Sequence, residues 1–193
     1  MPDPHYSLLA ELEKVKDLER PPIHLWNPDN VKDIDIRIAR DGTWYHEGTP
    51  IERHRLVRLF ATVMRLEDDG EYYLVTPVEK CRILVEDAPF LAVVMDVSGD
   101  GASQRLTFTT NVAETVVAGH EHPIRVEFDS VDDEPAPYVM VRDGLEALIS
   151  RNVFYEMVDL MVPREIDGVL YQGVWSDGEF FPFARSDDLP KAE

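Results

Sequence analysis

Six Asp-Gly pairs punctuate this sequence of 193 residues. Because glycine adopts a positive φ without strain, an Asp-Gly pair between two strand-like segments is typical of a β-hairpin turn. The segments between the pairs are short and rich in β-branched and aromatic residues, as in YYLVT, CRILVE, FLAVVMDV, QRLTFTT, ETVVAG, PIRVEF, YVMVR, VLYQGVW and EFFPFA. The sequence therefore predicts a chain made mostly of short strands joined by tight turns.

Two segments predict the main helices. Residues 51–67, IERHRLVRLFATVMRLE, place apolar side chains at helical spacing. The preceding segment Thr49-Pro50-Ile51-Glu52 predicts a capping box. In it the Thr49 hydroxyl accepts a hydrogen bond from a free backbone amide, and the Glu52 side chain reaches back to the capping residue. We expect a second helix from about 150 to 162. A shorter helical pattern covers residues 6–19 and ends at the proline-rich run RPPIHLWNPDN.

A weak internal repeat relates the two halves of the chain. Residues 51–75 align without a gap with residues 149–173, and Arg40-Asp41-Gly42 resembles Arg142-Asp143-Gly144. Each copy reads as strand, turn, returning segment, helix, Asp-Gly turn and strand, which indicates a duplication. The repeat also bears on LEALI at 145–149. Propensity favours a helix there, but the place of this segment in the repeat predicts a returning strand.

These patterns predict an α+β protein with two structurally related β-rich halves, each containing one main helix. We expect an N-terminal helical arm at 1–30, a first repeat domain at 31–97 and a second repeat domain at 98–193.

The charge of the chain restricts its partners. It carries 19 Lys plus Arg against 38 Asp plus Glu, a net charge of −19. Such a surface repels nucleic acid and anionic membranes, so we expect neither as a partner. The charge is unevenly distributed, since residues 37–82 hold eight basic and eight acidic residues while residues 83–193 have a net charge of −15. A small anion would therefore bind in the first half, unless the basic residues there only form the solvated face of a helix.

The chain shows no apolar h-region at its start and no apolar run of about 18 residues, so we expect a cytoplasmic protein. The only cysteine, Cys81, lies in an apolar strand-like segment, where a thiol usually serves packing.

Catalytic chemistry has little support in the sequence. The motif GHEHP would place His120 and His122 on one face of a strand, and with Glu127 they form an alternative metal-ligand set. An exposed polar turn is the better interpretation of the motif, because no histidine follows His122 in the chain. Our main interpretation assigns no catalytic residues and no metal ligands. It leaves open whether the chain is an enzyme, and the sequence favours a protein that is not one.

Anion binding has the stronger argument. The start of the helix at 51 would present free amides and a partial positive charge. Arg53 could add bidentate hydrogen bonds to the anion, and Arg151 occupies the matching position of the repeat. Trp44 could offer a flat face to a ring, and His46 a hydrogen-bonding edge.

The motif DGxWxHxGxPIxR at 41–53, followed by LVTPVEK at 74–80 and VEDAPF at 85–90, resembles a proteobacterial domain-of-unknown-function family. The resemblance covers nearly the whole chain. It implies a two-domain α+β protein with a duplicated core and a C-terminal domain like a pleckstrin-homology fold. It also implies a nucleotide-like ligand between the domains and a role in signal transduction. The motif positions are Trp44, His46, Arg53, Thr76, Glu79 and Lys80.

The sequence thus predicts a regulatory or signalling module that holds a small anionic, possibly nucleotide-type, ligand between two duplicated domains. Its candidate ligand-binding residues are Trp44, His46, Arg53, Thr76, Glu79, Lys80 and Arg151. The ligand and any cofactor stay unidentified, as does the oligomeric state. Two alternatives are a metal-dependent enzyme built on His120, His122 and Glu127, and an acidic module that binds a protein partner.

Overall fold

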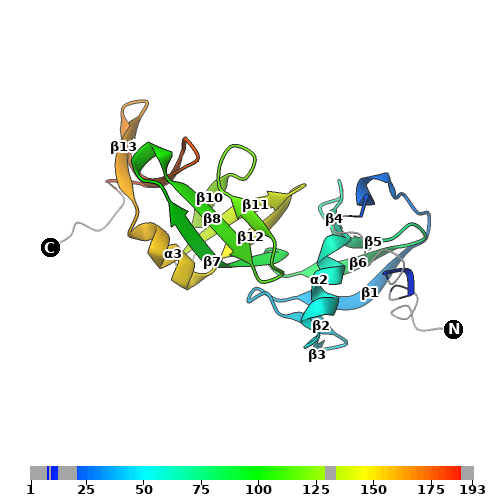
Figure 1. Cartoon of the computed structure of the whole chain (residues 1–193). Coiled ribbons are helices and arrows are strands. Elements are labelled where there is room, and N and C mark those ends of the chain that lie inside the picture. Colours follow the sequence, from blue (N-terminus) through cyan, green and yellow to red (C-terminus); the bar gives the residue numbers. More distant parts are fainter. Residues whose placement is uncertain (1–7, 9, 13–20, 129–133, 188–193) are drawn as a thin grey trace. The chain divides into compact units, whose positions relative to one another are not determined.

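A computed structural model describes residue 8 and residues 10–12, 21–128 and 134–187 of the chain. The fold is α+β, with many short strands and few helices, as predicted. It divides into two compact units, Met1–Pro89 and Phe90–Glu193, and each unit combines a six-stranded sheet with a helix (Figure 1). The predicted pair of β-rich halves, each with one main helix, is confirmed.

The first unit is built on one six-stranded sheet in the order β3-β2-β1-β6-β5-β4. All neighbouring strands are antiparallel except β1 and β6, which run parallel. Its elements are η1 (Ile23–Leu25), β1 (Val31–Ile38), β2 (Trp44–His46), β3 (Thr49–Pro50), α2 (His54–Thr62), β4 (Met64–Leu66), β5 (Tyr72–Val75) and β6 (Lys80–Val85).

The hairpin of β1 and β2 forms as predicted from Asp41-Gly42. Ile38 faces Trp44 across it, and Gly42 has a φ of 80°. The Asp41 carboxylate accepts a hydrogen bond from the Thr43 amide at 2.9 Å, which closes the turn. The alternation of isoleucines in β1 buries Ile36 and Ile38 on one face of the sheet.

The predicted capping box is wrong. Thr49 belongs to β3 and pairs with His46, so the chain at this point is extended and forms a second hairpin of β2 and β3. The helix α2 begins later, at His54, and its N-cap residue Arg53 makes no side-chain capping hydrogen bond. The first amides of this helix are therefore not satisfied by a capping side chain.

The predicted helix at 51–67 is also too long. It ends at Thr62, and β4 follows at Met64, which pairs with Leu74 across the Asp69-Gly70 turn. MRLE fits either structure by its own pattern, and pairing with β5 decides in favour of a strand. The apolar stripe of α2, Val57, Phe60 and Ala61, packs on the sheet as expected.

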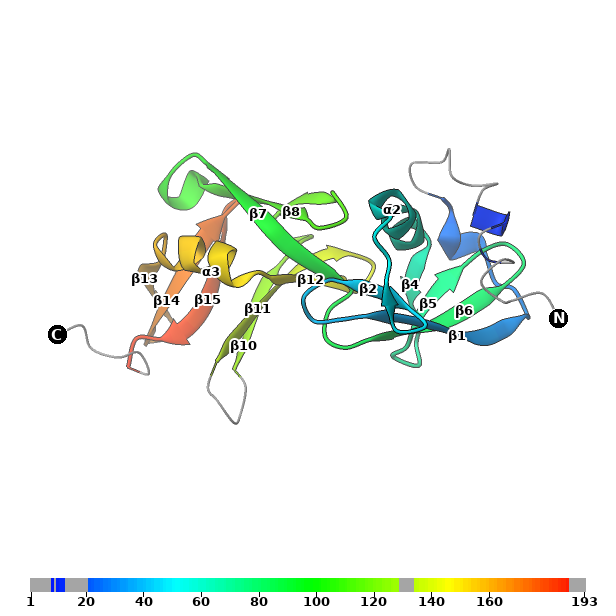
Figure 2. The ribbon, with the colours of Figure 1, turned by 90° about the horizontal axis from the view of Figure 1, so that it is seen from below.

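The second unit contains a six-stranded sheet in the order β10-β11-β12-β7-β8-β9 and a three-stranded sheet in the order β13-β14-β15 (Figure 2). In the larger sheet β7 and β12 are parallel. The elements are β7 (Phe90–Ser98), η2 (Gly101–Ser103), β8 (Arg105–Thr110), β9 (Thr115–Val117), β10 (Ile124–Phe128), β11 (Pro135–Arg142), β12 (Leu145–Ile149), α3 (Arg151–Val158), β13 (Val162–Ile166), β14 (Val169–Ser176) and β15 (Glu179–Arg185).

The order of elements predicted from the repeat is present in both units. β1, β2, α2, β4 and β5 correspond to β11, β12, α3, β13 and β14. LEALI forms the strand β12, and α3 begins two residues after it, so the prediction from the repeat is confirmed over the helix propensity. Each copy also contains a strand between its helix and its Asp-Gly turn, which the sequence reading did not separate from the helix.

Of the predicted helix at 6–19, Leu8 and Ala10–Leu12 are helical, and Leu8 and Leu12 are fully buried. The rest of that prediction lies outside the described residues. Within the described part of the chain, no helix has the length and apolar character needed to cross a membrane.

Candidate functional site

The two faces of the first sheet separate the candidate residues. Trp44 pairs with Ile38, and its ring stacks on Phe60 of α2 with the centroids 5.9 Å apart. Lys80 points to the opposite face, because its strand neighbour Cys81 is buried with the core and successive side chains alternate. Trp44 and Lys80 therefore cannot contribute to one small pocket.

Trp44 is a core residue. Only 2% of it is exposed, so its ring faces are not accessible to a ligand. Its indole Nε1 is buried without a hydrogen-bond partner among the described residues, which is uncommon for a tryptophan. His46 lies two residues further along the same strand, so its side chain is on the same face as Trp44. It is half-buried.

Thr76 and Glu79 form the turn between β5 and β6. The Thr76 amide donates to the Glu79 carbonyl at 2.9 Å, and the Glu79 amide donates to the Thr76 hydroxyl at 3.2 Å. Both residues are buried, and Glu79 forms an ion pair of 2.6 Å with Lys32 at the start of β1. These contacts give both residues a structural task in closing this end of the sheet.

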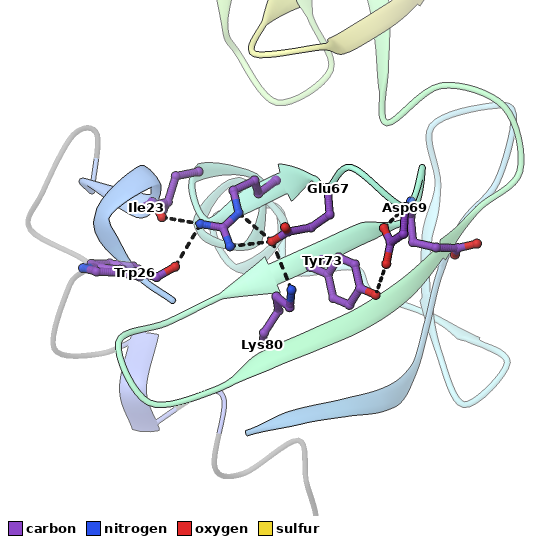
Figure 3. A network of polar contacts seen from close by, with 8 residues as sticks. Ile23, Trp26, Glu67, Asp69, Tyr73 and Lys80 are labelled. Carbon is purple, nitrogen blue, oxygen red and sulfur yellow. Dashed lines mark hydrogen bonds and ion pairs between the residues drawn. The ribbon is translucent and has the colours of Figure 1, made fainter. Parts of the chain in front are cut away.

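Lys80 belongs to a network of charged side chains shown in Figure 3. Its Nζ lies 3.3 Å from Glu67 and 4.5 Å from the centre of the Tyr73 ring. Arg65 also binds Glu67, and it donates to the carbonyl oxygens of Ile23 at 2.7 Å and Trp26 at 2.9 Å. The network therefore fastens the segment around η1 to β4.

The electrostatics of this network follow from its hydrogen bonds. Partial burial would raise the pKa of Glu67, but Arg65 and Lys80 outweigh that effect and lower it. The Tyr73 hydroxyl donates to Asp69 at 2.8 Å, and this bond raises the pKa of the phenol. The Glu71 amide, followed by the Tyr73 hydroxyl, lowers the pKa of Asp69. Each charge is thus stabilised by neighbours of this chain.

The arginines at the start of α2 differ from the other lysines and arginines that the structure describes in the first unit. Within its described residues, Lys32, Arg37, Arg40, Arg65, Lys80 and Arg82 each form an ion pair. Arg53, Arg55 and Arg58 form none there, and all three are exposed. On a helix, positions 55 and 58 are neighbours on one face. Sequence reasoning singled out Arg53 but missed Arg55 and Arg58.

This placement costs stability. Cations oppose the dipole at a helix N-terminus by about 0.3–1 kcal/mol each. No acid lies in the first turn of α2, and the like charges of Arg55 and Arg58 repel. A chain with twice as many acids as bases could easily pair these arginines, so their exposure suits an anion from outside the chain.

Arg151, the repeat mate of Arg53, has partners. Its guanidinium donates to the Tyr155 hydroxyl at 2.9 Å and to Glu134 at 3.2 Å. The hydrogen bond to Tyr155 is the main cause of a raised pKa for Arg151. The two halves thus differ at the start of their helices.

The alternative metal site finds no geometric support. His120 and His122 lie in a bend between β9 and β10 and not on a strand, so their side chains do not share one strand face. His122 Nδ1 lies 3.1 Å from the Met140 carbonyl, and Glu127 pairs with Arg125. Among the described residues, no group of three His, Cys, Asp or Glu side chains is placed to hold a metal.

Cys81 is fully buried, and burial, followed by the charge of Glu79, raises the pKa of its thiol to about 12. It is therefore a packing residue, as its sequence context predicts.

The fold defines a two-unit α+β protein in which each unit repeats one order of strands and helix. Residues 21–88 match the N-terminal domain of unknown function DUF1285, and residues 89–183 match the C-terminal domain of the protein of unknown function DUF1285. The chain belongs to the DUF1285 family. The family resemblance found in the sequence is confirmed.

Two solved structures are similar to this chain. A DUF1285 family protein from Silicibacter pomeroyi is 51% identical, with 94% of this chain and 96% of that chain covered and a TM-score of 0.85. A second, from Shewanella baltica, is 28% identical, with 64% of this chain and 90% of that chain covered and a TM-score of 0.50. No curated protein matches the chain.

Proposed function

We propose that this protein is a regulatory or signalling module that binds a small anionic ligand of the nucleotide type. The observation that carries the proposal is the group of exposed arginines at the start of α2, Arg53, Arg55 and Arg58. They lie in a chain with a net charge of −19, and the other lysines and arginines described in the first unit each form an ion pair with an acid of this chain.

Guanidinium groups suit phosphate because their planar fork makes two parallel hydrogen bonds to its oxygens. The first amides of α2 add donors, since Arg53 provides no side-chain cap. An anion bound here would also remove the repulsion between Arg55 and Arg58. Trp44 and Lys80 have other tasks in the sheet, so the proposal does not rest on them.

Binding is tested by isothermal titration of the full chain with ATP, ADP, AMP and inorganic tripolyphosphate at fixed ionic strength. We expect an R55A/R58A variant to bind at least about tenfold more weakly, because each charge-assisted contact to phosphate contributes more than a neutral one. Arg82→Ala is the matched control, since it removes an exposed arginine that pairs with Asp33 in β1.

Comparison of ATP with tripolyphosphate shows whether a base contributes to binding. If none of the four compounds binds, or if R55A/R58A binds as tightly as the unaltered chain, the proposal is wrong.

A further inference from the structure

The three-stranded sheet of the second unit has two very different faces. Its inner face carries Val174, Ser176, Phe181 and Phe183, all buried. Ser176 is fixed there by two hydrogen bonds, from the Leu106 amide at 2.9 Å and to the Ala118 carbonyl at 2.6 Å. These contacts attach the inner face of the small sheet to β8 and to the residue that follows β9.

The outer face gathers aromatic side chains around Arg164. Because side chains alternate along a strand, Tyr171 and Trp175 of β14 lie on the same face, and the pairing adds Arg164 beside Tyr171 and Phe180 beside Trp175. None of these four side chains is buried. We call this group, Arg164, Tyr171, Trp175 and Phe180, the outer aromatic face.

The absence of a side chain at Gly173 lets the Phe180 ring pack directly on the backbone of β14. A Cβ atom at Gly173 would lie 2.9 Å from the Phe180 ring and 2.2 Å from the Phe181 carbonyl oxygen. The Phe180 ring therefore lies close over the backbone of β14, and its other neighbour is Trp175, with the centroids 5.4 Å apart in an edge-to-face arrangement. The result is a rigid surface whose aromatic groups have few conformations to lose on binding.

Arg164 is held by rings and not by a carboxylate. Its guanidinium carbon lies 4.4 Å from the centre of the Trp175 ring and 5.3 Å from that of Phe180. Stacking uses the flat face of the guanidinium and leaves its N–H edge available. Within the described residues Arg164 and Arg185 have no ion pair, whereas Arg105, Arg125, Arg142 and Arg151 each bind an acid of this chain. Arg185 pairs with Tyr171 at the edge of the same face.

The second half of the chain is rich in acidic residues. Residues 83–193 carry 22 acidic and seven basic residues, so a pairing acid for Arg164 would be easy to supply. The outer aromatic face instead presents Arg164 as a cation held in place by aromatic rings. Tyrosine, tryptophan and arginine are also the residues that contribute most to the energy of protein interfaces.

We propose that the outer aromatic face docks a segment of a partner protein that carries a carboxylate between apolar side chains. The carboxylate pairs with the N–H edge of Arg164, and the flanking apolar side chains lie on Trp175, Phe180 and Tyr171. This surface lies in the second unit and does not depend on the anion site of α2, so it gives a signalling module a separate place to meet its target.

The test uses fluorine NMR of the full chain labelled with 5-fluorotryptophan, in which Trp26, Trp44 and Trp175 give separate signals. The probe is the peptide acetyl-Leu-Asp-Leu-Glu-Leu-amide, and the matched control is acetyl-Leu-Asn-Leu-Gln-Leu-amide. We expect the Trp175 signal alone to shift with the acidic peptide. The amide control should bind at least about tenfold more weakly, because it lacks the charge-assisted hydrogen bonds to Arg164.

Arg164→Gln is the informative variant, since it keeps a polar side chain at an exposed position, removes the charge and leaves the rings in place. It should retain the dispersed tryptophan signals and lose at least about tenfold in affinity, and Arg164→Lys should fall between the two because it keeps the charge without the fork. Equal binding of both peptides, an unchanged affinity in Arg164→Gln, or no shift of Trp175 at millimolar peptide would overturn the proposal. A Trp175 shift on simple dilution of the protein would also overturn it, by identifying a second copy as the occupant.

Discussion

The ion pair between Lys32 and Glu79 offers a quantitative test of whether Glu79 serves the fold. Its atoms Nζ and Oε2 are 2.6 Å apart, and the side chains are 23% and 2% exposed respectively. At an effective dielectric constant of about 20, two unit charges at this distance attract by about 6 kcal/mol. Removing either ion from water costs several kcal/mol, so the intact pair contributes little net stability.

Breaking the pair is expected to be costly and asymmetric. Lys32→Met leaves the more deeply buried carboxylate without this cation and should lower the free energy of unfolding by about 3–5 kcal/mol. Glu79→Gln leaves an ammonium group that still reaches water, and should cost about 1–3 kcal/mol.

Urea denaturation followed by circular dichroism measures both variants and the double variant K32M/E79Q. We expect the double variant to be clearly more stable than the sum of the single losses implies, with a coupling energy of about 1–3 kcal/mol. Additive losses, or a Glu79→Gln loss larger than that of Lys32→Met, would refute the reasoning from burial.

Three further predictions concern other parts of the chain. Gly173→Ala should lower the unfolding free energy by about 1–3 kcal/mol, because the new Cβ would lie 2.2 Å from the Phe181 carbonyl oxygen. At the control position Gly48 nothing lies within 4 Å, so Gly48→Ala should cost only the strain of its positive φ. Thermal melting compares the two variants. Arg65→Met should speed amide hydrogen exchange around Ile23 and Trp26, whose carbonyl oxygens it binds, while exchange in β1 stays unchanged. Because burial raises the pKa of Cys81 to about 12, its contribution to stability is complete below about pH 9 and is lost as the pH rises towards 12, by about 1.4 kcal/mol per pH unit. Cys81→Ala should flatten that slope in denaturant titrations, and a slope equal to that of the unaltered chain would contradict the assignment.

The strands and hairpins could be predicted because they depend on local patterns. Alternation in β1 and the Asp41-Gly42 turn are sufficient to specify the first hairpin. The end of α2 could not be predicted, since residues 64–66 suit a helix or a strand and only pairing with β5 distinguishes them. The capping box failed for the same reason, because Thr49 pairs with His46 across a hairpin.

The candidate site was harder to predict, because a charge in a sequence does not show whether it is paired. Arg58 and Arg65 look alike in IERHRLVRLFATVMRLE. In the structure Arg65 binds Glu67 and two backbone carbonyls, whereas Arg58 is exposed without an ion pair among the described residues. The outer aromatic face was missed because VPREI in β13 does not alternate between apolar and polar residues.

The two parallel strand pairs have a consequence for synthesis of the protein on the ribosome. In each unit the first strand of the larger sheet pairs with a strand made much later, β1 with β6 and β7 with β12. A nascent chain that has reached Pro89 holds every strand of its first sheet. One that has not reached Ile149 must leave an edge of β7 open, where it can pair wrongly with other chains. Each half of this protein therefore exposes an open strand edge during synthesis until its late parallel partner is made.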